Sequence, residues 1–134
     1  MLLPHGAVIA LADGRNFELY RNAGNEAEPK LAALPSPRLD SRNKGSGVHH
    51  RLSTGNPQTH LLEEDAHAAA VAEWLNAQVL GNKIETLVVI AAPRTLGELR
   101  RHYHKRTEQA LNGELSKDLI GRPEDAILDA LKGG

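Results

Sequence analysis

The chain has 134 residues, of which 40% are apolar and 25% are charged, and its formal net charge at pH 7 is −1. This composition is typical of one soluble globular domain, and the chain has no overall field that would attract nucleic acid. It contains no cysteine and only 3% aromatic residues. Disulfides and cysteine-based sites are therefore excluded, and a platform of exposed rings for stacking bases is disfavoured.

The first third of the chain predicts an antiparallel meander. Residues 7–12 form an apolar run typical of a buried strand, and the Asp13-Gly14 pair that follows is typical of a hairpin turn. Residues 17–21 and 30–34 predict two further strands. The apolar run is too short to span a membrane and has no basic flank of the kind that precedes a signal peptide core, so we expect a cytoplasmic protein with no membrane partner.

Residues 35–60 predict a long loop within a single domain, 1–134. The segment is rich in proline, serine, glycine, asparagine and basic side chains. Loops of this length inside a compact domain are usually functional or disordered. Cationic side chains and glycine N–H groups suit contacts with phosphate, and a solvated surface loop is the alternative. The candidate phosphate contacts in this loop are Arg38, Arg42, Lys44 and Arg51.

A helix is predicted over residues 62–79. Its first turn would hold the acidic residues 63–65, which suit the positive end of the helix dipole, and Gly81-Asn82 would end it. Successive residues of a helix are rotated by about 100°, and this projection centres the buried side on Val71.

Three polar residues of this region project onto that buried side, namely His60, Glu64 and His67. Imidazole and carboxylate groups three or four positions apart on a helix can share a metal ion, so these residues and Asp13 are candidates for a metal or acid–base site. A hydrogen-bonded network that orients the loop is the alternative, with Asp13 forming a turn. The sequence predicts no cofactor.

Residues 86–92 predict a strand buried on both faces, and Pro93 suits the first turn of a helix that would extend to residue 106. Thr95 and Glu98 have the spacing of a capping box, which gives a second possible start. Ligands of open α/β sheets usually bind at such a strand-to-helix turn. This segment contains five basic residues against Glu98 alone. The candidate phosphate contacts here are Arg94, Thr95, Arg100 and Arg101.

A short strand over residues 110–116 and a helix from about Pro123 complete the order βββαβαβα. This order predicts an α/β fold with a mixed five-stranded sheet and flanking helices. Residues 36–60 and 94–106 together hold nine of the sixteen basic residues. The sequence contains no phosphate-binding loop, nucleophile elbow or dinucleotide fingerprint.

Four segments, which together extend over nearly the whole chain, resemble one bacterial family. They are LPHGAVIALADGR (3–15), HLLEEDAHAAAVAEWLN (60–76), APRTLGELR (92–100) and KDL (117–119). The family is that of bacterial proteins described as required for attachment to host cells, and it is similar to the central domain of archaeal and eukaryotic peptide release factors and of pelota. The resemblance implies a ribonuclease H-like fold of the kind found in components of the translational machinery.

In the release factors, the central domain carries a Gly-Gly-Gln tripeptide on the loop before its long helix. The corresponding residues 43–60 are NKGSGVHHRLSTGNPQTH, without that tripeptide. We therefore expect a non-catalytic cytoplasmic domain whose partner is the ribosome or structured RNA. The alternatives are a metal-dependent hydrolase or nuclease of ribonuclease H-like fold and a protein-interaction module.

Overall fold

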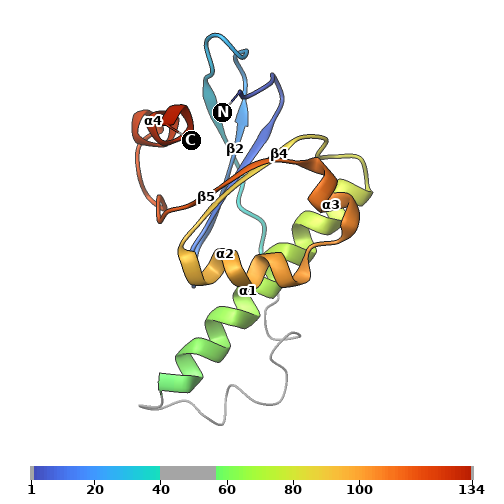
Figure 1. Cartoon of the computed structure of the whole chain (residues 1–134), viewed down its shortest axis with the longest axis vertical. Helices are drawn as coiled ribbons and strands as arrows, with labels where there is room; N and C mark the ends of the chain where they lie inside the picture. The colour runs from blue at the N-terminus through green and yellow to red at the C-terminus, as the bar shows by residue number, and fades with distance from the viewer. Residues whose placement is uncertain (1, 40–56, 134) are drawn as a thin grey trace.

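The computed structural model of the chain describes residues 2–39 and 57–133 (Figure 1). The elements within these ranges are β1 (Val8–Ala12), β2 (Phe17–Asn22), β3 (Leu31–Leu34), α1 (Pro57–Leu80), β4 (Leu87–Ala91), α2 (Pro93–His102), α3 (Lys105–Ala110), β5 (Leu111–Ser116) and α4 (Glu124–Gly133). The expected order is confirmed with one addition, because two helices occupy the segment that was predicted to form one. No helix in the described ranges is both long and apolar enough to cross a membrane.

The five strands form one sheet in the order β3-β2-β1-β4-β5. Strand β1 pairs antiparallel with β2 and parallel with β4, while β2 pairs antiparallel with β3 and β4 pairs parallel with β5. The predicted mixed five-stranded sheet with flanking helices is therefore confirmed. A three-stranded meander followed by two parallel strands is also the arrangement expected of a ribonuclease H-like fold.

Helices cover both faces of the sheet, which explains why β1 and β4 are buried along their whole length. Alternate residues of β1 face opposite layers, because successive side chains of a strand point to opposite sides. Val8 and Ala10 pack in the core formed with α1 and α2, whereas Ile9 and Leu11 pack in the core formed with α4. Figure 1 shows α1 and α2 on one side of the sheet and α4 on the other.

Helix α1 begins at Pro57, five residues before the predicted start. Proline suits the first turn of a helix, where its missing N–H has no intrahelical partner to lose. The acidic residues 63–65 therefore lie beyond the first turn, so their predicted role at the positive end of the helix dipole is wrong. The buried side is as predicted, since Val71 and Leu75 are fully buried and Trp74 packs edge-on against Phe17 of β2, with ring centroids 5.6 Å apart.

The predicted end of α1 at Gly81-Asn82 is confirmed. Asn82 has a φ of 62°, in the left-handed region that commonly follows a helix. The Asn82 N–H donates to the Val79 carbonyl and the Lys83 N–H donates to the Gln78 carbonyl, which is the hydrogen-bond pattern of a Schellman motif. This cap satisfies two of the last carbonyls of α1 and fixes the backbone that carries Lys83.

The helix predicted over residues 93–106 is interrupted after His102. Tyr103 and His104 are extended, and the His104 side chain then caps α3 by accepting a hydrogen bond from the Arg106 N–H at 3.0 Å. The first of the two helices begins at Pro93, so the alternative start at the Thr95–Glu98 capping box is wrong. The interruption allows the chain to turn from α2 into α3 before it enters β5.

Candidate functional site

The turn between β1 and β2 is organised by Asp13. Its Oδ1 accepts hydrogen bonds from the backbone N–H groups of Arg15 and Asn16, at 2.8 and 2.6 Å. Burial on its own would raise the pKa of Asp13, but these hydrogen bonds and the nearby His67 outweigh burial and lower the pKa below its ordinary value. The turn-forming role considered for Asp13 is therefore confirmed.

The N-terminal half of α1 packs against this turn and brings His60 and His67 to it. A guanidinium nitrogen of Arg15 lies 3.2 Å from Nδ1 of His60. Nε2 of His67 lies 3.2 Å from the carbonyl oxygen of Asn16, to which a protonated ring nitrogen donates. Each imidazole thus has one nitrogen engaged in a contact that joins α1 to the sheet.

Glu64 completes the contact between α1 and the turn, because its side chain lies directly against Gly14. A Cβ atom at Gly14 would lie 2.6 Å from the carboxyl carbon of Glu64. The fold therefore brings all four metal candidates to one region. Within residues 2–39 and 57–133, however, no group of three or more histidine, aspartate or glutamate side chains is placed to hold a metal ion. The contacts present are those of a network between α1 and the β1–β2 turn.

The start of α2 is joined to α1 by an ion pair between Arg94 and Asp65, with nitrogen and oxygen 3.0 Å apart. The other oxygen of Asp65, Oδ1, is buried and has no hydrogen-bond partner among the residues that the structure describes. Thr95 is buried at 5% exposure, which turns this candidate phosphate contact toward the interior.

The remaining predicted arginines of α2 also have carboxylate partners. Arg100 donates twice to Oε1 of Glu114 in β5, at 3.1 and 3.2 Å, and Arg101 lies 3.1 Å from Glu98. Burial and the adjacent Glu114 carboxylate raise the pKa of Tyr103, whose hydroxyl lies 3.5 Å from Glu114. Glu98 is the one acidic residue within the segment 94–106, and the fold adds carboxylates from other parts of the chain, Glu114 here and Asp65 at the start of α2.

Two further cations, Lys105 and Arg106, are exposed at the start of α3, and neither forms an ion pair with any residue of the described ranges. The junction that presents them is held by Asn76 of α1. Its Nδ2 donates to the His102 carbonyl at 2.9 Å and its Oδ1 accepts from the His104 N–H at 2.9 Å. The exposed basic residues of α2 and of the start of α3 form a set defined by position in the chain, and we refer to this set as the α2–α3 cationic face: Arg94, Arg100, Arg101, Lys105 and Arg106.

Of the cations predicted in the long loop, Arg38 is exposed on the extended segment after β3. The other three, Arg42, Lys44 and Arg51, lie outside the described residues. Residues 57–60, which were assigned to the loop, belong to α1. Because the loop leads into α1 and Arg94 lies at the start of α2, we expect the loop and α2 to lie on one side of the molecule, and this stays a prediction.

The strand order of the sheet reverses between β1 and β4, because β3, β2 and β1 lie on one side of this boundary and β4 and β5 on the other. The chain therefore leaves the carboxyl end of β1 toward β2 and the carboxyl end of β4 toward β5, which makes the boundary a topological switch point of the kind where ligands of open α/β sheets usually bind. Helices α1 and α2 pack on the same face of the sheet, in one core with Val89 and Ala91 of β4 (Figure 1). The ligand site expected at the turn after β4 stays a prediction.

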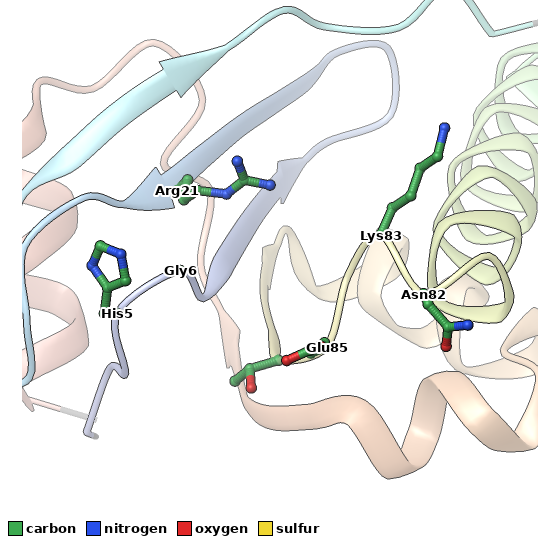
Figure 2. Close-up of a pocket in the computed structure, with 7 residues that line it drawn as sticks. His5, Gly6, Arg21, Asn82, Lys83 and Glu85 are labelled. Atoms are coloured by element: carbon green, nitrogen blue, oxygen red, sulfur yellow. The ribbon is translucent and has the colours of Figure 1, made fainter.

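A pocket lies at the opposite end of the sheet, next to the amino ends of β1 and β4 (Figure 2). Its volume is about 320 Å³. It is lined by His5, Gly6, Arg21, Asn82, Lys83, Glu85 and Thr86. Sequence reasoning missed these residues, because they come from three separate segments and share no motif or spacing.

A model of the family described as bacterial archaeo-eukaryotic release factor family 12 matches residues 6–131. The chain belongs to this family. No curated protein matches the chain. The family description agrees with the release-factor part of the resemblance found in the sequence, while the host-attachment name stays a prediction.

Proposed function

We propose that this release-factor-like protein binds the ribosome, or other structured RNA, through the α2–α3 cationic face and does not hydrolyse peptidyl-tRNA. The family match over residues 6–131 carries the proposal, because release factors are named for their action in translation. A ribosomal partner implies that the protein acts in the cytoplasm.

The proposal excludes hydrolysis because of the sequence of the loop before α1. The resemblance implies that catalysis by release factors depends on a Gly-Gly-Gln tripeptide at this place, and the sequence contains that tripeptide neither there nor elsewhere. The chain has this fold without the tripeptide, and the exposed cations of α2 and α3 remain available for contacts with RNA. Binding without peptide release is the function that these features support together.

The charge of the α2–α3 cationic face supports binding to phosphate. Its five cations exceed the three carboxylates that pair with them, Asp65, Glu98 and Glu114, by two charges. The arginines of these ion pairs are exposed and their carboxylates are partly buried. Ion pairs at the protein surface contribute only about 0–1 kcal/mol, so a phosphate can compete for the arginines. Lys105 and Arg106 need no such exchange. Contacts of this kind position a protein on RNA without reading its sequence.

The test is a titration of the purified chain with ribosomes and with a generic structured RNA at several salt concentrations. Each phosphate contact contributes about 0.7–0.9 to the slope of log K against log salt. The double variant Lys105→Ala/Arg106→Ala should therefore make the slope shallower by about 1.4–1.8. The matched control is Arg122→Ala/Lys132→Ala, which removes the same charge from exposed positions before and within α4 and should leave the slope unchanged.

Two results would contradict the proposal. One is the absence of binding to ribosomes and RNA at low salt, which would leave a protein-interaction module as the better explanation. The other is an equal loss of slope in both double variants, which would mean that the α2–α3 cationic face has no special role. Peptide release by the purified chain would overturn the non-hydrolytic part alone.

A further inference from the structure

We propose that the pocket at the amino ends of β1 and β4 binds a small phosphorylated sugar, with the phosphate held by Arg21 and Lys83 and the sugar hydroxyls held by Glu85 and its neighbours. The pocket shares no residue with the α2–α3 cationic face. The inference therefore does not depend on RNA binding.

The register of the sheet places Arg21 in this pocket. Phe17 and Leu19 of β2 pack in the core beneath α1 and α2, and Arg21 is the next residue on the same face. Arg21 pairs with Val8 at the amino end of β1 and is exposed. Figure 2 shows the Arg21 side chain directed from β2 toward the connection that carries Lys83, while the Lys83 side chain extends away from Arg21. The two groups can therefore hold one phosphate only when the exposed Lys83 side chain turns toward Arg21.

The other lining residues come from the two segments that lead into the parallel strands. Lys83 follows the cap of α1, and Glu85 and Thr86 lead into β4. The Thr86 carbonyl accepts a hydrogen bond from the Val8 N–H at 2.9 Å, which ties this segment to β1. Gly6 has a φ of 84°, a conformation that favours glycine, and this lets the chain turn into β1 at the edge of the pocket.

The charges lining the pocket have no internal partners. Within residues 2–39 and 57–133, Arg21, Lys83 and Glu85 form no ion pair, whereas all three predicted arginines of α2 do. With His5 neutral, the lining carries two positive charges and one negative charge. Nδ1 of His5 lies 2.6 Å from the Gly24 carbonyl, so Nε2 is the nitrogen left for a ligand.

These groups match a ligand with an anionic end and a hydroxylated end. A guanidinium and an ammonium group are the side chains that proteins use to hold phosphate. The Glu85 carboxylate would repel a second anion but accepts hydrogen bonds from hydroxyls, and Asn82 and Thr86 can both donate and accept. No phenylalanine, tyrosine or tryptophan side chain lines the pocket, so the stacking surface that it offers to a base is limited to the His5 ring and the Arg21 guanidinium. Its volume is at the lower end of the range for small-molecule sites.

The test is isothermal titration calorimetry of the full chain with ribose 5-phosphate, inorganic phosphate and ribose. We expect saturable binding of ribose 5-phosphate, weaker binding of phosphate and no detectable binding of ribose. Arg21→Ala and Lys83→Ala should each weaken ribose 5-phosphate at least about tenfold, because each removes a charged hydrogen bond. Both positions are exposed, so folding should be retained, and circular dichroism checks this. Arg122→Ala and Lys132→Ala are the matched controls and should leave the affinity unchanged.

Glu85→Gln tests the hydroxyl part of the proposal. It removes the repulsive charge, so phosphate should bind as well as before or better, while the preference for ribose 5-phosphate over phosphate should fall. The absence of saturable ribose 5-phosphate binding, or binding that is insensitive to Arg21→Ala and Lys83→Ala, would overturn the proposal. A preference that survives Glu85→Gln would overturn the role assigned to that carboxylate.

Discussion

The α2–α3 cationic face and the pocket differ in where their cations come from in the sequence and in whether those cations form ion pairs. The face draws its five cations from thirteen consecutive residues, 94–106, and the fold then supplies carboxylate partners for the three arginines. The pocket draws Arg21 and Lys83 from distant parts of the chain and supplies no partner within the described ranges. Clustering of charge in the sequence thus does not tell which cations remain unneutralised, because within the described ranges Lys105 and Arg106 form no ion pair while the three arginines of the same cluster do.

Each region nevertheless has its own asparagine, whose side chain holds the surrounding backbone by hydrogen bonds. Asn22 is fully buried; its Nδ2 donates to the Leu3 carbonyl at 2.7 Å and its Oδ1 accepts from the N–H groups of Gly24 and Lys30. Asn76 plays the corresponding part at the junction of α2 and α3 and is only half-buried. The two asparagines offer a way to disturb one region and leave the other intact.

Asn22→Ala should produce the largest effect. It removes a fully buried side chain and leaves several backbone groups without partners, each of which costs about 1–3 kcal/mol when it stays buried. We expect the free energy of unfolding to fall by roughly 3 kcal/mol, measured by urea denaturation. The same variant should lose ribose 5-phosphate affinity, because it releases the segment that carries His5 and Gly6.

The matched control for that variant is Asn25→Ala in the same β2–β3 turn. Asn25 is exposed and its Oδ1 accepts one hydrogen bond, from the Glu28 N–H at 2.7 Å. We expect a loss of less than about 1 kcal/mol. Equal losses for the two variants would mean that burial of Asn22 adds nothing.

Asn76→Ala should reduce the free energy of unfolding by less than Asn22→Ala, and it should weaken binding at the α2–α3 cationic face and not at the pocket. The variant frees the backbone of His102 and His104, which are exposed and can recover hydrogen bonds from water. It also leaves the hydroxyl of the fully buried Thr107, which donates to Asn76 Oδ1 at 2.7 Å, without a partner, so we expect a loss of roughly 2 kcal/mol. Binding of ribosomes should weaken while the ribose 5-phosphate affinity stays at the wild-type value. If this destabilised variant binds ribosomes as tightly as the wild type, the α2–α3 junction does not take part in ribosome binding.

The order of elements could be predicted because each signal is local. The apolar runs of β1 and β4 and the Gly81-Asn82 helix end depend only on neighbouring residues. The interruption after His102 could not be predicted in that way. Leu96, Leu99 and Tyr103 keep a helical spacing through it, and the backbone is taken out of the helix by Asn76, 26 residues earlier in the chain.

The candidate site was predictable in part for the same reason. The local pattern identified the exposed arginines of α2, but their partners lie 29 residues away in the case of Arg94 and 14 residues away in the case of Arg100. The pocket depends on the pairing of β1 with both β2 and β4, which no single segment encodes. Long-range pairing, which local periodicity cannot reveal, accounts for both failures.

A third prediction concerns Tyr103, which shares Glu114 with Arg100. Its pKa is raised in the folded protein, mainly by burial, so the tyrosine ionises first in the unfolded chain, near its ordinary value of 10.0. The contribution of the neutral Tyr103 to the free energy of unfolding is therefore fully present below pH 10. It is lost as the pH rises further, by at most about 1.4 kcal/mol per pH unit. Urea denaturation between pH 8 and about 11 should show a shallower loss for Tyr103→Phe than for the wild type. Tyr20→Phe changes the more exposed tyrosine, so this variant should show most of the wild-type loss of stability with pH. If the wild type and Tyr103→Phe lose stability in parallel as the pH rises, the loss does not come from Tyr103.

The smallest effect tests whether ion pairing shields the α2–α3 cationic face. Asp65→Asn removes the carboxylate that lies 3.0 Å from Arg94 and leaves an isosteric amide. The freed guanidinium should add at most one phosphate contact, so the salt slope of RNA binding should steepen by up to about 0.7–0.9 and the affinity at low salt should rise.

Glu63→Gln is the control for Asp65→Asn. It removes the same charge from an exposed position on α1 that forms no ion pair within the described ranges, so it changes the net charge without freeing an arginine. If the affinity for RNA rises equally in the two variants, the gain comes from the change in net charge alone. The face would then resemble the pocket after all, with its cations available to phosphate despite their carboxylate neighbours.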